Sequence, residues 1–226
     1  MSQPVTLERL RTRLSQLSGT GLIGSAGSLK LRIAEIERAL PWRGLARGAL
    51  HEVIGERNAI TAFLAAAIGR DARSEEVLWL TSEPTLYAHG LAQMGLDHRR
   101  LTIVAARRTD DRLWAAEEAL RELGYGAVIA EIDSADLTET RRLQLAAEKS
   151  GSIGFLIRRD QQPSAALTRW RIEPARSDGY RPCWRVTLER CRGADAGFSW
   201  DVEWDYATFS FRLVVALADG SLAATE

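Results

Sequence analysis

Short apolar segments alternate with longer amphipathic ones through the middle of the chain. The short segments, which we predict to be strands, are residues 49–54, 77–80, 101–105, 127–132 and 153–157. The longer segments, which we predict to be helices, are residues 59–68, 86–94, 110–123 and 137–149, with glycines at 95, 124 and 151 placed to end three of them. Apolar strands separated by helices are typical of a parallel sheet buried on both faces. The pattern therefore predicts an α/β fold with a mostly parallel sheet and helices on both of its faces.

The period of the pattern changes after Arg158. Apolar residues then alternate with polar or charged ones at Trp170 and Ile172, at Trp184, Val186 and Leu188, and at Trp200, Val202, Trp204 and Tyr206. This alternation is typical of strands with one face in solvent, and residues 209–215 are predicted to form a last strand. We therefore predict that the C-terminal third is a short antiparallel extension of the main sheet.

The two ends of the chain differ from this middle part. Apolar residues at helical spacing between Val5 and Leu17 predict an amphipathic helix, and the four glycines within 18–28 predict a flexible linker. Residues 29–40 are predicted to form a second short helix or a turn segment that ends before Pro41. The predicted organisation is a helix and linker at 1–28, a core at 29–218 and a disordered tail at 219–226. The N-terminal helix has two alternatives, packing on its own core or self-association with another chain.

Composition narrows the class of protein. The chain has 226 residues, a formal net charge of +0 and a pI of about 6.9, whereas proteins that bind nucleic acid mainly through phosphates usually carry a clear basic excess. It shows no signal peptide and no run of the roughly 18 apolar residues needed to span a bilayer. Cys183 and Cys191 would lie about 26 Å apart on one strand, too far for a disulfide, and two cysteines without a histidine make a poor metal site. We expect a cytoplasmic protein without metal or membrane segment.

Residues 51–63 have the strand, turn and helix start of a phosphate-binding loop but lack its chemistry. If the motif G-x-x-x-x-G-K-[ST] begins at Gly55, Ile60 takes the place of the second glycine and Thr61 that of the lysine. The chain has only two lysines, and neither is near this segment. Arg57 lies in the middle of the loop, where its side chain would point differently. We therefore predict no nucleotide hydrolysis and no cofactor, and we favour a plain connection between a strand and a helix.

Three acidic residues follow predicted strands. Glu83 comes after the strand at 77–80, and Glu131 and Asp133 end the strand at 127–132. The carboxyl ends of parallel strands form the edge where open α/β sheets bind ligands, so Glu83 is a candidate general base and the other two are candidate Mg²⁺ ligands. The alternative is a solvated or helix-capping carboxylate, as in the run 133–139. Because no phosphate-holding partner accompanies them, we favour capping.

Basic residues gather where the last parallel strand is predicted to end. Arg158 and Arg159 close that strand, and Arg169 and Arg171 flank Trp170. Arginines interleaved with an aromatic residue can bind single-stranded nucleic acid, and arginine and tryptophan are also favoured at the centres of protein interfaces. Trp170 falls on the apolar side of its strand, so packing in the core is a third interpretation. We favour a partner surface over a DNA site.

Five segments of the chain carry a family signature. They are residues 45–53 (LARGALHEV), 113–120 (LWAAEEAL), 141–148 (RRLQLAAE), 163–171 (PSAALTRWR) and 202–205 (VEWD). Together they resemble the ImuA family, an SOS-inducible mutagenesis family also described as SulA-like or RecA-like. The resemblance extends over about residues 40–217.

More distantly, the chain resembles the core of the RecA recombinase. Glu83 matches the position of that family's catalytic glutamate, and Gly95 and Asp97 follow at matching distances. The chain departs from the family at the missing P-loop lysine and at the short segments after Asp133 and Arg159, where a recombinase carries DNA-binding loops. This resemblance implies a RecA-like fold that has lost its ATPase.

The ImuA resemblance also implies a role. Members of the family act in DNA-damage tolerance with ImuB, an inactive Y-family polymerase homologue, and with an error-prone polymerase, and contact with RecA is a further expectation. Our first hypothesis is therefore a non-catalytic assembly protein of this mutasome, which supports translesion synthesis through protein contacts. Two alternatives stay open: a nucleotide sensor that does not hydrolyse ATP, and a protein that binds single-stranded DNA directly.

Overall fold

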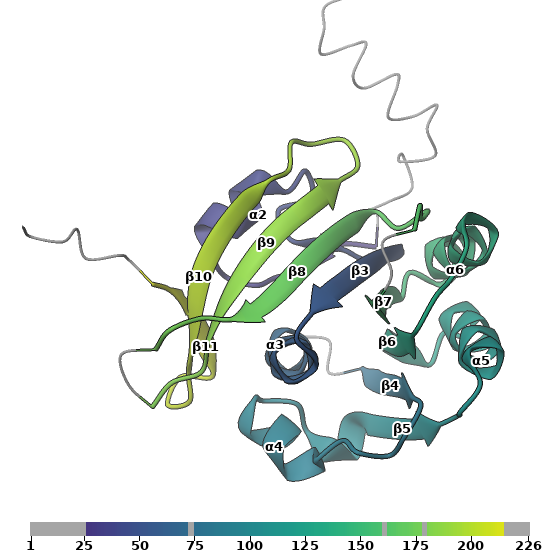
Figure 1. Cartoon of the computed structure of the whole chain (residues 1–226), viewed down its shortest axis with the longest axis horizontal. Helices are drawn as coiled ribbons and strands as arrows, with labels where there is room; N and C mark the ends of the chain where they lie inside the picture. The colour runs from purple at the N-terminus through teal and green to yellow at the C-terminus, as the bar shows by residue number, and fades with distance from the viewer. Residues whose placement is uncertain (1–25, 72–74, 160–161, 178–179, 215–226) are drawn as a thin grey trace, which may run out of the picture.

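The computed structural model describes residues 26–71, 75–159, 162–177 and 180–214. Within these residues nine strands form one twisted sheet in the order β11-β10-β9-β8-β3-β7-β6-β4-β5, and β1 and β2 form a separate pair (Figure 1). The predicted helix at 5–17 and the predicted tail at 219–226 lie outside the described residues.

The elements follow the predicted order closely. The strands are β1 (Ser28–Leu29), β2 (Leu45–Ala46), β3 (Ala49–Gly55), β4 (Glu76–Thr81), β5 (Leu101–Ala105), β6 (Tyr125–Ile132), β7 (Ile153–Arg158), β8 (Thr168–Pro174), β9 (Cys183–Cys191), β10 (Phe198–Asp205) and β11 (Ser210–Leu213). The helices are α2 (Ala34–Ala39), α3 (Arg57–Gly69), α4 (Ala88–Gln93), α5 (Thr109–Arg121) and α6 (Leu137–Ser150), with a 3-10 turn at His98–Arg100. The five strands and four helices predicted between residues 49 and 157 are confirmed.

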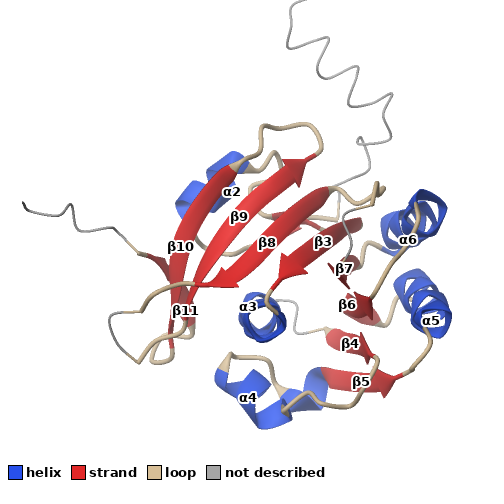
Figure 2. Cartoon of the chain, in the orientation of Figure 1, coloured by secondary structure: helices blue, strands red, loops and turns tan. Residues whose placement is uncertain are grey.

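The parallel part of the sheet is buried on both faces. β3 pairs with β7 and β8, β7 with β6, and β4 with β6 and β5, all in parallel. Helices α3 and α4 cover one face, and α5 and α6 cover the other (Figure 2). Alternate residues of one strand therefore enter different cores, as Trp79 packs on the side of α3 and Leu78 on the side of α5. This two-sided burial explains why the strands are apolar runs in the sequence.

The prediction that the strand at Trp170 belongs to the antiparallel extension is wrong. β8 runs parallel to β3, with Thr168 opposite His51 and Ile172 opposite Gly55. Antiparallel pairing starts only between β8 and β9 and continues through β10 and β11. A parallel strand with one open face has the same alternation of apolar and polar residues as an antiparallel one, so the pattern could not separate them.

Most of the predicted helix ends are confirmed. Asp136 and Glu139 form a reciprocal capping box at the start of α6, and Gly151 follows the helix in the left-handed conformation, with φ of 79°. Gly124 does not end α5 as predicted, because the helix already stops at Arg121 and Glu122 is extended.

The segment at 29–40 is a helix only in its second half. Leu29 pairs with Leu45 between β1 and β2, and α2 starts at Ala34. Leu31, Ile33 and Ile36 are buried in the core that lies under the C-terminal strands, where Figure 2 shows α2 behind β9 and β10. The segment thus covers one face of the sheet extension.

Three further features bear on the predictions from composition. In the described ranges, no helix combines the length and apolar character needed to cross a membrane. Cys183 and Cys191 lie at opposite ends of β9 and form no disulfide with each other. No three side chains of His, Cys, Asp or Glu gather into a metal-binding group within the described part of the chain.

Candidate functional site

The carboxyl edge of the parallel sheet holds the segment that the sequence compares with a phosphate-binding loop. β3 ends at Gly55 and α3 begins at Arg57, so Glu56 alone connects them. Ile60 and Thr61 therefore lie inside the helix, where the Thr61 hydroxyl donates to the Arg57 carbonyl at 2.8 Å. A phosphate-binding loop wraps its ligand in successive backbone N–H groups of a glycine-rich turn, and a one-residue connection offers no such turn.

Gly55 has a packing role at this junction. Its φ is 128°, and a Cβ atom there would lie 2.1 Å from the carbonyl oxygen of Ile172 on β8. Only a residue without a side chain allows β3 and β8 to approach so closely. The glycine that matches the first position of the motif is therefore explained by strand packing.

A carboxylate of the chain itself occupies the N-terminus of α3. Glu56 Oε2 accepts a hydrogen bond from the backbone N–H of Ala59 at 2.7 Å. Helix N-termini attract anions because their first N–H groups are unpaired and the helix dipole is positive there. An external phosphate would have to displace Glu56 to use this position.

Arg57 crosses the sheet edge to Glu131 at the end of β6. Arg57 Nη2 lies 2.6 Å from Glu131 Oε2, and the Thr81 hydroxyl lies 3.1 Å from the same oxygen. The other carboxylate oxygen accepts from the indole N–H of Trp79 at 3.3 Å. Glu131 is therefore the partner of an arginine, and the capping role predicted for this region belongs to Asp136.

The space left around this ion pair is small. The cavity measures about 70 Å³, and Arg57, Ile60, Glu131 and Arg159 are among the residues that line it. Small-molecule sites usually measure about 300–1,000 Å³. The cavity at the Arg57–Glu131 pair is therefore too small for a nucleotide in this conformation.

Arg112 on α5 ties the neighbouring strand ends together, and sequence reasoning missed it. Its buried guanidinium donates to the carbonyls of Ala106, Arg107 and Glu131 at 2.6–2.9 Å, and to Asp133 at 2.9 Å. Asp133, predicted as a cap or Mg²⁺ ligand, is thus an arginine partner. The one sequence signal was the place of Arg112 on the buried side of an amphipathic helix.

Glu83 lies at the predicted edge, where the Thr81 hydroxyl lies 2.9 Å from the Glu83 carbonyl and 3.1 Å from the Glu131 carboxylate. It is exposed and lines a separate hollow of about 520 Å³ with Pro84, Thr85 and Arg107. Its role as the vestige of a catalytic glutamate stays a prediction.

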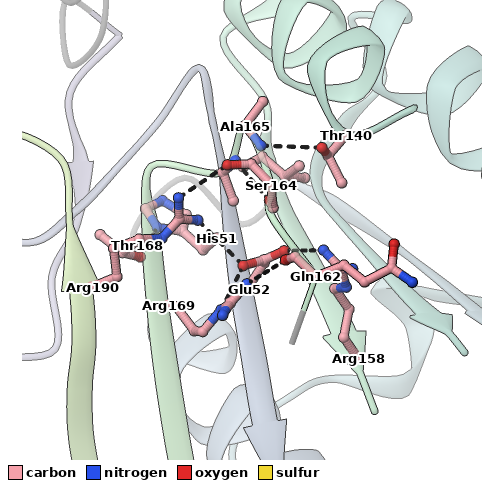
Figure 3. A network of polar contacts seen from close by, with 12 residues as sticks. His51, Glu52, Thr140, Arg158, Gln162, Ser164, Ala165, Thr168, Arg169 and Arg190 are labelled. Carbon is pink, nitrogen blue, oxygen red and sulfur yellow. Dashed lines mark hydrogen bonds and ion pairs between the residues drawn. The ribbon is translucent and has the colours of Figure 1, made fainter. Parts of the chain in front are cut away.

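A second polar group is buried beneath the connection from β7 to β8. Glu52 on β3 is fully buried, and its carboxylate contacts Arg158 on β7, Arg169 on β8 at 2.8 Å and Arg190 on β9 at 3.3 Å (Figure 3). Burial raises the pKa of Glu52, but hydrogen bonds from Ser164 and Arg169 and the arginine charges outweigh it and lower the pKa below 4.5. Glu52 is therefore ionised at neutral pH. Neither Glu52 nor Arg190 was predicted as a site residue.

The predicted cluster of four arginines and Trp170 does not form one surface. Arg158 and Trp170 are 2% and 3% exposed, so neither side chain can meet a ligand at the surface in this conformation. Arg169 turns inward to Glu52, and Arg171 is ion-paired across to β9 at 2.6 Å. Arg159 has an 80% exposed side chain. The core interpretation of Trp170 agrees with this placement, and binding by Arg159 and Arg171 stays a prediction.

His51 neighbours Glu52 on β3 and is also fully buried. Its Nε2 lies 2.9 Å from the Ala46 carbonyl and its Nδ1 lies 2.7 Å from the Thr168 hydroxyl. Because a carbonyl only accepts, Nε2 carries the proton and Nδ1 accepts from Thr168. Burial lowers the pKa of His51 to about 4, against the opposing bond to Ala46, so this histidine is neutral at physiological pH and holds β3 to β8.

Comparisons with known proteins place this geometry in context. No protein-family model matches the chain. The chain is 36% identical over 221 residues to Protein ImuA of two strains of Caulobacter vibrioides, which covers 84% of this chain and 90% of each relative. It is also similar in fold to the crystal structure of the RadB recombinase, with a TM-score of 0.63 and 15% identity over 83% of this chain and 100% of that one. The structural likeness confirms the predicted RecA-like fold.

Proposed function

This chain belongs to the ImuA family, and on that basis we propose that it is a non-catalytic assembly protein of the SOS mutasome. In this role it binds an ImuB-type homologue of Y-family polymerases and supports error-prone translesion synthesis after DNA damage. Contacts with RecA and with the error-prone polymerase are part of the same proposal.

The Arg57–Glu131 ion pair is the observation that best supports the proposal that this protein does not hydrolyse ATP. ATP-hydrolysing enzymes of this general fold use a lysine on the phosphates and a carboxylate that helps hold Mg²⁺. Here the connection has no lysine, Glu56 caps the helix, and an arginine neutralises the carboxylate at the strand end. These three features support a fold that is used for binding other proteins.

ATP turnover by the purified full-length chain tests this part. We expect no phosphate release above background with ATP and Mg²⁺, and no difference between the wild type and Glu83→Gln. Turnover that Glu83→Gln abolishes would contradict the proposal. A saturable rise in the thermal unfolding midpoint with ATP would favour the nucleotide-sensor alternative.

Copurification tests the assembly part. We expect the full-length chain to form a stable complex with the ImuB-type protein encoded in the same genome when the two are produced together. A chain that begins at Ala26 then separates the contribution of residues 1–25 from that of the folded core. If the full-length proteins elute separately at micromolar concentration, the assembly role is wrong.

A further inference from the structure

The layer formed by α5 and α6 exposes large apolar side chains. Figure 1 shows the two helices side by side on one flank of the sheet, and their buried sides share one core with β6 and β7. To solvent they present Trp114 on α5 and Leu137 and Leu145 on α6, which are 65%, 54% and 51% exposed. All seven tryptophans of the chain lie in the described ranges, and Trp114 alone is exposed rather than buried or half-buried. Exposed apolar side chains that gather on one surface are typical of an interaction site.

Carboxylates surround Trp114 on its own helix. Residues three and four apart are neighbours on a helix surface, and the acidic residues at these distances that reach solvent are Asp110, Asp111 and Glu118. Arg108 pairs with the first of them and Arg121 with the last, but both pairs are exposed and contribute little. The surface around Trp114 therefore suits an apolar segment that carries positive charge.

The N-terminal segment, which lies outside the described residues, has the matching chemistry. Leucines stand at positions 7, 10, 14 and 17, and arginines at 9, 11 and 13 outnumber the one acid of the segment, Glu8. The spacing of three and four residues puts the leucines on one stripe of the helix predicted at 5–17. A stripe of leucines accompanied by arginines complements a tryptophan accompanied by carboxylates.

The described part of the chain begins beside the end of α6. A Cβ atom on Gly151, which follows α6, would lie 3.2 Å from the side chain of Ala26. The nine steps of the chain from Leu17 to Ala26 reach at most about 30 Å. Helix α6 has 14 residues and is about 21 Å long, and packed helices lie about 8–10 Å apart. The predicted helix can therefore reach the solvent side of α5 in the same molecule.

We propose that the predicted N-terminal helix docks on the α5 face at Trp114 of its own chain. Its C-terminal end would lie nearest to Gly151, so the helix would run parallel to α5. A short flexible linker gives a tethered segment an effective concentration in the millimolar range, so a weak contact is enough to hold it there. The inference concerns a contact within one chain and does not depend on the proposed assembly function.

The charges of α6 place the helix nearer to α5. Arg141 and Lys149 are exposed on α6, whereas Arg142 is held by the buried Glu117 of α5. The two exposed cations repel the arginines of the N-terminal segment, while the carboxylates beside Trp114 attract them. The helix is therefore expected to lie over α5 and not over α6.

Hydrogen exchange of the full-length chain, followed by mass spectrometry, tests the proposal. Isolated helices shorter than about 12–15 residues are marginal in water, so the amides of residues 5–17 are protected only if the helix is docked. We expect them to exchange about tenfold more slowly than the same amides in a synthetic peptide of residues 1–20. Trp114→Ser should remove most of this protection, because it removes the apolar centre of the contact.

Tyr180→Ser is the matched control. Tyr180 is also an exposed aromatic residue, but it lies between β8 and β9, away from α5 and α6, so its replacement should leave the exchange of residues 5–17 unchanged. Both side chains are exposed, so both variants should keep a thermal unfolding midpoint within about 3 °C of the wild type. A loss of protection in Trp114→Ser then reflects the contact and not the fold.

A further variant tests the charges separately from the tryptophan. Asp111→Asn combined with Glu118→Gln removes two carboxylates beside Trp114 and should reduce the protection about threefold at low salt. The difference from the wild type should shrink as the salt concentration rises, because salt screens exposed charges. A reduction that is independent of salt would show that these carboxylates do not attract the N-terminal segment.

Three results would overturn the proposal. The first is exchange of residues 5–17 as fast in the full-length wild type as in the peptide. The second is an equal effect of Trp114→Ser and Tyr180→Ser. The third is protection that rises with protein concentration between about 1 and 50 μM, which would assign the α5 face to the N-terminal helix of a second copy.

Discussion

Two glutamates of the parallel sheet face arginines, and the two sites differ in balance and depth. Glu131 faces one arginine whose side chain is 41% exposed, so the pair is neutral and borders solvent. Glu52 contacts three arginines, and two of them are 13% exposed or less. The first site lies at the edge where open α/β sheets bind ligands. The second joins β3, β7, β8 and β9 through one carboxylate.

The difference in burial between the two sites indicates where the stability of the fold depends on an ion pair. At the Glu131 site the arginine can turn into water if its partner is lost, so we expect the pair to contribute little to stability. At the Glu52 site Arg158 and Arg169 have little water to turn to, so the loss of Glu52 would leave charges inside the sheet with less compensation. The substitutions below test this contrast.

The largest effect is expected from Glu52→Gln. We expect the free energy of unfolding, measured by urea denaturation at pH 7, to fall by about 3–5 kcal/mol, since removing one partner leaves buried charges uncompensated. Glu131→Gln is the matched control and should lose about 1 kcal/mol or less, because Arg57 is partly solvated. Equal losses in the two variants would show that burial does not distinguish the two sites.

The next effect is a pH dependence that arises from His51 on β3. The folded pKa of His51 is about 4 and its ordinary value is 6.5, so between these values the unfolded chain binds more protons. The stability due to the neutral imidazole is complete above about pH 6.5 and falls as the pH drops towards 4. Between pH 7 and 5 we expect a loss of about 2 kcal/mol in urea denaturation.

Two histidine variants isolate that contribution. His51→Gln keeps a donor for Ala46 and an acceptor for Thr168 but cannot titrate, so it should remove the slope between pH 7 and 5. His98→Gln changes a histidine whose side chain is 67% exposed and should leave the slope intact. Glu52 does not contribute to the slope between pH 7 and 5. Because its pKa is lowered in the folded protein, the stability that its charge provides is lost only as the pH falls below about 4.5. A slope that survives in His51→Gln would assign it to another group.

The sequence predicts the parallel half of the fold well and the charged interior poorly. Strands such as β4 and β6 are apolar on both faces, and that signal comes from local burial alone. Whether β8 runs parallel or antiparallel depends on which strand it pairs with. The alternation of apolar and polar residues within β8 does not contain that information. Glu52 looks like an ordinary polar residue within β3, because a lone sequence does not show which arginines converge on it. The contact of Arg190 with Glu52 could not be predicted either. It depends on a bulge in the pairing of β8 with β9, which places Arg190 opposite Arg169, and a lone sequence does not show how two strands pair.

The smallest stability effect is expected from Arg57→Gln, and it sharpens the comparison most. Half-exposed ion pairs contribute about 0.2–1 kcal/mol, so the unfolding free energy should change by no more than that. The substitution frees the Glu131 carboxylate, yet Glu56 still caps α3 and the connection still lacks a lysine. We therefore expect no ATP turnover and no shift of the thermal unfolding midpoint with Mg²⁺ and ATP. If Arg57→Gln alone produced saturable nucleotide binding, the Arg57–Glu131 pair would be a gate over a working site, because one side chain would then be all that separates the closed edge from an open one.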